Sequence, residues 1–71
     1  MNFLYVYAWA NGTLLMRTVM VPEAAAEFSA RFIENANRKP PMVRLTKRTR
    51  LAFPFGTKLT LAISKHRLKW A

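Results

Sequence analysis

The hydrophobic positions near the N-terminus form two alternating runs that are separated by a short polar turn. Aromatic residues occupy every second position of Phe3–Trp9, and this period of two, in residues that favour strands, predicts a β-strand. Asn11 and Gly12 follow, and both residue types adopt the positive φ that a two-residue type I′ turn requires. Thr13–Val21 is a second strand-forming run. The two runs therefore predict a β-hairpin.

A two-residue turn fixes which side chains share a face of this hairpin. It places Tyr7 opposite Met16 and predicts an aromatic and methionine-rich face, which contains Tyr5, Tyr7, Trp9 and Met16. The other face is aliphatic except for Arg17. Monomers rarely expose an apolar face of this size, so we expect a homodimer interface or a second core. A docking surface for a host protein and a platform that stacks unpaired bases remain open.

The next segment changes to the three- and four-residue spacing of a helix. Pro22 suits a first helical turn, and Ala25, Phe28 and Phe32 recur on one apolar stripe. The prolines at positions 40 and 41 disfavour helical backbone in the residue before them. Residues 22–37 therefore predict one amphipathic helix.

Alternation returns in residues 42–53 and again in residues 57–63, with the turn-forming sequence Pro-Phe-Gly between them. Residues 64–71 fit either an extension of the last strand or a short C-terminal helix with Ser64 as its cap, and we favour the helix. The predicted order is β-β-α-β-β. We expect a small α+β fold over residues 1–71, a single domain in which one helix packs on one face of an antiparallel sheet.

The charge of the chain is unevenly distributed along its length. The chain has a net charge of +9 and a pI near 11.4, and Arg17 and Arg31 are the only two of its 12 Lys and Arg residues that precede Arg38. The remaining ten follow without any Asp or Glu, because all three acidic residues lie on the predicted helix. Such an excess of positive charge attracts polyanionic partners.

The most regular basic residues lie on the predicted strand 42–53. Arg44, Arg48 and Arg50 would project from one face, where alternate side chains stand about 7 Å apart, and arginine binds phosphate through two parallel hydrogen bonds. We therefore predict a small basic nucleic-acid-binding protein that contacts phosphates through Arg38, Lys39, Arg44, Arg48, Arg50, Lys65, Arg67 and Lys69. The sequence does not choose between DNA and RNA. Its size and charge are typical of accessory regulators of phages and other mobile elements.

Two other functions remain open. The protein could dock on an acidic host protein and inhibit it, with the aromatic face as the anchor. It could also cleave RNA with His66 as general base, assisted by Arg67 or Tyr7, since it is similar in size and charge to small bacterial toxins that cleave messenger RNA. We do not expect an enzyme and assign no catalytic residue, because His66 is the only histidine and the acids are spaced for the helix surface.

Composition narrows the remaining possibilities. The chain has no cysteine and therefore no disulfide, which fits a reducing, cytoplasmic location. One His and three Glu predict no metal site, and the two isolated glycines form no phosphate loop, so we expect no cofactor. No apolar stretch approaches the roughly 20 residues of a membrane span, and we expect no membrane partner. A core in 71 residues is marginal, which favours a homodimer.

Overall fold

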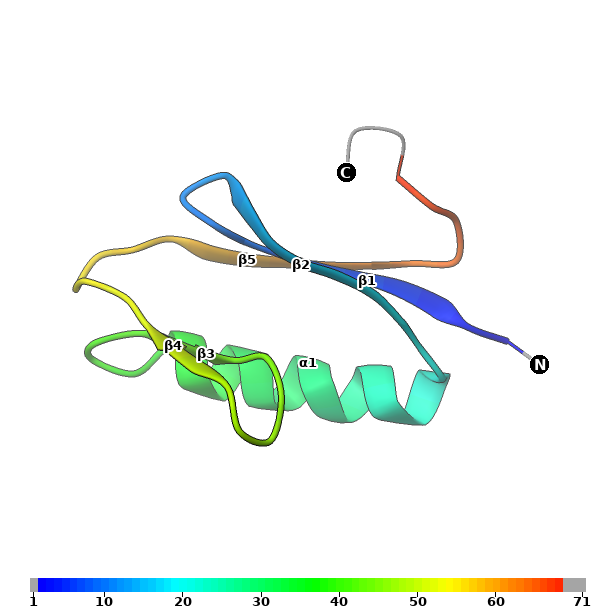
Figure 1. Cartoon of the computed structure of the whole chain (residues 1–71), viewed down its shortest axis with the longest axis horizontal. Helices are drawn as coiled ribbons and strands as arrows, with labels where there is room; N and C mark the ends of the chain where they lie inside the picture. The colour runs from blue at the N-terminus through cyan, green and yellow to red at the C-terminus, as the bar shows by residue number, and fades with distance from the viewer. Residues whose placement is uncertain (1, 69–71) are drawn as a thin grey trace.

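A computed structural model describes residues 2–68. In chain order, these residues form β1 (Leu4–Ala10), β2 (Thr13–Met20), α1 (Pro22–Ala36), β3 (Met42–Arg44), β4 (Arg50–Ala52) and β5 (Leu59–Ser64). An antiparallel sheet has the order β2-β1-β5, and β3 and β4 form a separate two-stranded sheet. Figure 1 shows α1 and the β3–β4 pair on one side of the larger sheet, while the chain after β5 turns to the other side. The predicted α+β class, with one helix on an antiparallel sheet, is confirmed.

The predicted N-terminal hairpin and its turn are confirmed. Asn11 and Gly12 have φ values of 49° and 83°, in the positive range that their residue types tolerate. The turn is also tied to the residue before β5. The Asn11 N–H donates to the Lys58 carbonyl (2.8 Å), and the Lys58 N–H donates to Asn11 Oδ1 (2.9 Å).

The predicted register of this hairpin is wrong beyond its first two pairs. Trp9 pairs with Leu14 as expected, but a β-bulge then makes Leu15 an extra residue, so that Ala8 pairs with Met16 and Tyr7 with Arg17. A shift of one residue moves every following side chain to the opposite face. Met16 therefore packs against the core cluster on the α1 side, and Arg17 joins the aromatic face.

The hydrophobic core lies between the larger sheet and the helix layer. α1 ends one residue before the predicted boundary, with Asn37 as its C-cap. Phe32 on α1, Ala8 on β1 and Val43 on β3 are buried together at the centre of the core. Eight partly buried apolar side chains surround them: Leu15, Met16, Phe28, Ala36, Leu45, Phe53, Leu59 and Leu61. Burial of these side chains is the main force that holds the two layers together.

The basic segment after the helix folds into a hairpin, which contradicts the prediction of one continuous strand over residues 42–53. Thr46 closes the loop between β3 and β4, because its Oγ1 accepts the N–H groups of Arg48 (3.2 Å) and Thr49 (3.0 Å). Arg44 then pairs across the hairpin with Arg50. Arg44 and Arg50 therefore face each other on two short strands, with Arg48 in the loop between them, instead of all three arginines following one another along a single strand.

The segment after β5 contains no helix in residues 65–68, and residues 69–71 of the predicted C-terminal helix lie outside the described residues. Ser64 Oγ accepts the His66 N–H (3.1 Å) and so supports a bend. The Leu68 N–H then donates to the hydroxyl of Tyr7 (3.0 Å). This bond attaches the segment to the face of the larger sheet that lies away from α1 (Figure 1).

No helix in the described part of the chain has the length and apolar character needed to cross a membrane.

Candidate nucleic-acid interface

The structure divides the predicted phosphate-binding residues between the two sides of the larger sheet. Arg44, Arg48 and Arg50 lie on the β3–β4 hairpin, and Arg38 and Lys39 follow the end of α1. The segment that contains Lys65 and Arg67 turns to the opposite side (Figure 1), and Lys69 lies outside the described residues. The seven residues that are described therefore do not form one continuous surface.

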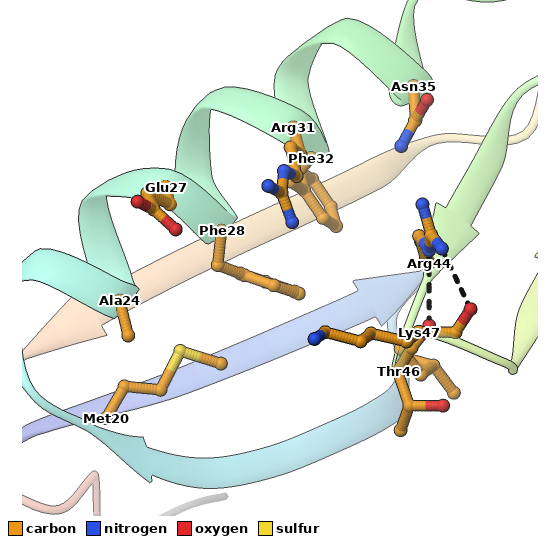
Figure 2. A pocket seen from close by; sticks show the side chains of 11 residues that line it. Met20, Ala24, Glu27, Phe28, Arg31, Phe32, Asn35, Arg44, Thr46 and Lys47 are labelled. Carbon is orange, nitrogen blue, oxygen red and sulfur yellow. Dashed lines mark hydrogen bonds between the residues drawn. The ribbon is translucent and has the colours of Figure 1, made fainter.

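The richest group of cations surrounds the β3–β4 hairpin, and we call it the hairpin cluster. It consists of Arg31, Arg44, Lys47, Arg48 and Arg50. Three of these residues border a cavity of about 270 Å³ between α1, the end of β2 and the β3–β4 loop (Figure 2). Its apolar wall consists of Met20, Ala24, Phe28, Phe32 and Leu45, and its polar rim of Glu27, Arg31, Asn35, Arg44, Thr46 and Lys47. Three cations and one carboxylate give the rim a net positive charge.

Arg44 is held in place by the loop that it borders. Its Nη2 donates to the Lys47 carbonyl (2.8 Å), and its Nε is 3.3 Å from the Thr46 carbonyl, as the dashed lines in Figure 2 show. A guanidinium group has five N–H donors, so these two bonds leave three for an external anion. The side chain is also half-buried. Arg44 is therefore oriented before any ligand binds, which lowers the entropic cost of binding.

Thr46 also fixes the backbone of the loop that carries the other cations of the hairpin. Lys47, Arg48 and Arg50 are exposed, and Figure 2 shows Lys47 reaching from the loop into the space that β2 and α1 enclose. Arg31 reaches into the same space from α1. The sequence pattern alone does not indicate Arg31 or Lys47 as site residues, because Arg31 precedes the basic half and Lys47, three positions after Arg44, would lie on the opposite face of a continuous strand.

An exposed aromatic residue lies beside a cation at the end of the helix layer. Phe55 is 75% exposed, and Lys39 Nζ is 5.8 Å from its ring centroid. The Phe53 N–H donates to the Pro41 carbonyl (3.0 Å) and thereby joins the two loops that carry Phe55 and Lys39. A phenyl ring beside a cation is a combination that stacks on unpaired bases. Sequence analysis assigned Phe55 only to a turn, although neither neighbour, Pro54 nor Gly56, requires an aromatic residue there.

The aromatic face differs from its prediction in two side chains. Tyr7 is fully buried, stacked on Trp9 with ring centroids 5.9 Å apart, and its hydroxyl accepts the Leu68 N–H. It cannot stack on a base or on a second protein while this segment covers it. Met16 lies on the α1 side of the sheet. A cavity of about 230 Å³ lies beside this face and is lined by Tyr5, Tyr7, Arg17, Thr18, Val19 and Arg67.

Two of the three residues considered for RNA cleavage line one cavity, and His66 is not among its lining residues. His66 is exposed in the bend after β5, while Tyr7 and Arg67 line the neighbouring cavity without it. Within residues 2–68, no three His, Asp or Glu side chains lie close enough together to hold a metal ion.

No protein-family model, no curated protein and no solved structure matches the chain.

Proposed function

We propose that this protein binds nucleic acid mainly through its phosphates, with the hairpin cluster as the primary contact surface. The observation that carries the proposal is Arg44, which the loop carbonyls orient while three of its N–H donors make no hydrogen bond to a described residue. Arginine holds phosphate through a planar pair of hydrogen bonds. Four more cations surround this anchor. Contacts of this kind position a nucleic acid without reading its sequence.

Phe55 and Lys39 supply the feature by which the protein would distinguish single-stranded from double-stranded nucleic acid. An exposed ring next to an ammonium group can stack on a base only where that base is unpaired. We therefore propose a preference for single-stranded segments over duplex DNA or RNA. Replacement of Phe55 by Leu keeps an apolar side chain in the turn and should reduce this preference, while duplex binding stays unchanged.

The salt dependence of binding tests the primary surface. Fluorescence anisotropy with labelled oligonucleotides gives the binding constant between about 50 and 300 mM salt. Five phosphate contacts predict a log–log slope of about −4.5 on duplex DNA and about −3.5 on a single strand. The variant K47Q/R48Q/R50Q removes three exposed cations and should flatten the duplex slope by about 2.7. It should weaken binding to all sequences by similar factors.

A matched control removes the same charge elsewhere. K58Q/K65Q/R67Q also lowers the net charge from +9 to +6, but its three residues lie outside the hairpin cluster, so the slope should change by less than about 1. Equal flattening in both variants would mean that net charge alone drives binding and would reject the hairpin cluster as the site. Absence of binding at about 50 mM salt would reject the function itself.

An acidic protein partner is the second candidate function, and the apolar wall of the 270 Å³ cavity favours it. Phosphates do not need phenyl rings, whereas an apolar side chain flanked by carboxylates would fit both Phe28 and the cationic rim. Pull-down from a nuclease-treated lysate separates the two candidates. A stoichiometric partner that survives nuclease and about 0.3 M salt, and is lost in R31E, would favour the protein partner.

A further inference from the structure

The edge of the larger sheet at β5 is open in the described part of the chain. The strand order β2-β1-β5 leaves β5 with a strand neighbour on one side only. Lys58 directs its N–H and carbonyl toward Asn11 at the end of β1. Because these groups alternate in direction along an antiparallel strand, Thr60, Ala62 and Ser64 bond to β1. The N–H and carbonyl groups of Leu59, Leu61 and Ile63 must therefore point outward.

β5 also lacks the features that prevent an edge strand from pairing with the edge strand of another molecule. β5 has the sequence LTLAIS, which contains no charged residue and no proline, and its pairing with β1 is continuous. The opposite edge strand, β2, carries the exposed Arg17 and a β-bulge. Charges and bulges are the common means by which proteins prevent pairing between edges. β2 is therefore protected, while β5 is not.

An apolar groove runs beside the open edge, between β5 and α1. It has a volume of about 520 Å³, and Ile33 from α1 and Ile63 from β5 are 56% and 38% exposed on it. Leu59 and Leu61 extend the apolar surface, and Ser29 and Asn37 are its polar residues. None of the residues that line the groove is charged. In a chain of net charge +9, this is a surface where a second copy can approach with little charge repulsion.

We propose that two copies of this chain associate along β5 about a two-fold axis and form a continuous six-stranded sheet. A two-fold axis between two antiparallel β5 strands makes the surface complementary to itself. The groove residues of each copy then cover the apolar edge of the other. A marginal core in a domain of this size gains stability from such a partner. The proposal does not depend on nucleic-acid binding.

The alternation of side chains limits the register of this dimer, and the register that pairs all three outward-facing residues places the axis at Leu61. Residues that lie opposite each other in an antiparallel pair share a face, so odd-numbered residues of β5 must pair with odd-numbered residues of the second copy. An axis at Leu61 pairs Leu61 with its own equivalent and Leu59 with Ile63 of the second copy. These are the residues whose backbone groups point outward, so three such pairs form with two hydrogen bonds each. Both α1 helices then lie on the same face of the joint sheet.

Cross-linking tests the register, because the chain has no natural cysteine. In the proposed dimer, Thr60 lies opposite Ala62 of the second copy at a Cα separation of about 4.5 Å, within the range of a disulfide. Two copies of residue 60 are diagonal neighbours, about 7–8 Å apart, beyond that range. An oxidised mixture of T60C and A62C should therefore contain mainly the mixed disulfide. Equal amounts of the T60C homodimer, measured by mass spectrometry, would overturn the register.

Sedimentation without nucleic acid tests the dimer itself. The wild type should sediment as a dimer at about 100 μM, and added salt should not dissociate it, whereas salt weakens phosphate binding. Ile63→Lys places a charge in the groove and should raise the dissociation constant at least about tenfold. Val19→Lys adds the same charge to an exposed position, 49% exposed, on the other edge strand and should have no effect. Circular dichroism confirms that both variants fold.

Two results would overturn the proposal. A wild type that remains monomeric at about 0.5 mM would exclude a second copy and leave the β5 edge for a strand from another protein. Equal dimerisation of the wild type and a folded Ile63→Lys variant would place the interface elsewhere. Both results are independent of oligonucleotide binding, so the failure of this proposal can be distinguished from the failure of the proposed function.

Discussion

Replacement of Tyr7 by Phe isolates the single bond that attaches the segment after β5 to the sheet. Tyr7 is fully buried, and its hydroxyl accepts the Leu68 N–H at 3.0 Å. Phenylalanine keeps the ring and its stacking on Trp9, so little apolar burial changes. The substitution removes one hydrogen bond and leaves the Leu68 N–H without this acceptor.

The size of the effect follows from the environment of this bond. A typical intramolecular hydrogen bond contributes about 0.5–1.5 kcal/mol net, and this bond is partly buried. A tenfold change in an equilibrium corresponds to about 1.4 kcal/mol. The opening equilibrium of the segment should therefore rise about 2- to 12-fold. The free energy of global unfolding should fall by no more than about 1.5 kcal/mol, because the segment can detach without disturbing the core around Phe32.

Amide hydrogen exchange measured by NMR checks this expectation at the donor itself. The Leu68 amide should exchange about 2- to 12-fold faster in Tyr7→Phe, while amides in the centre of α1 change little. Tyr5→Phe is the matched control, since Tyr5 lines the neighbouring cavity and has no hydrogen bond through its hydroxyl among the described residues. Identical exchange at Leu68 in the two variants would show that the Tyr7 hydroxyl does not hold the segment.

Two further substitutions test the core and the loop. Val43→Ala removes two buried methyl groups from the centre of the core and should lower the free energy of unfolding by about 2 kcal/mol in urea titrations. Val19→Ala, at an exposed position, is the control and should change this free energy by less than about 0.5 kcal/mol. Equal effects of the two substitutions would place the core elsewhere. Thr46→Val removes the acceptor of the Arg48 and Thr49 N–H groups and should weaken oligonucleotide binding about 3- to 10-fold. The salt slope should stay unchanged because no charge is lost, and a flatter slope would show that the loop has lost phosphate contacts.

The elements that sequence analysis predicted correctly are those with local causes. Asn11 and Gly12 adopt positive φ because of their own residue types. The apolar spacing in α1 brings Ala25 and Phe32 to the buried side within a few turns. Neither result depends on distant parts of the chain, so a single sequence was enough to predict them.

The bulge at Leu15 could not be predicted in this way. Any residue in an alternating apolar run can be the extra one, and the choice depends on which register fills the core. Leu15 and Met16 both pack against the core cluster, and this packing requires the one-residue shift. The consequence reaches the aromatic face, since the same shift places Arg17 opposite Tyr7.

The hairpin in the basic segment was missed for a different reason. Its loop contains no glycine, proline, asparagine or aspartate, the residues that usually indicate a turn. The side chain of Thr46 performs the role by accepting two backbone N–H groups, a weaker turn signal that the alternating pattern obscured. The prediction of one continuous strand also prevented Arg31 and Lys47 from being predicted as site residues. Their position at the cavity depends on how the hairpin packs against α1.

The difference between the two borders of the larger sheet limits how far the chain can polymerise. If two copies join along β5, both remaining borders are β2 strands, each with its irregular ladder and Arg17. A third copy then finds no compatible border, and growth ends at a closed pair instead of a fibril.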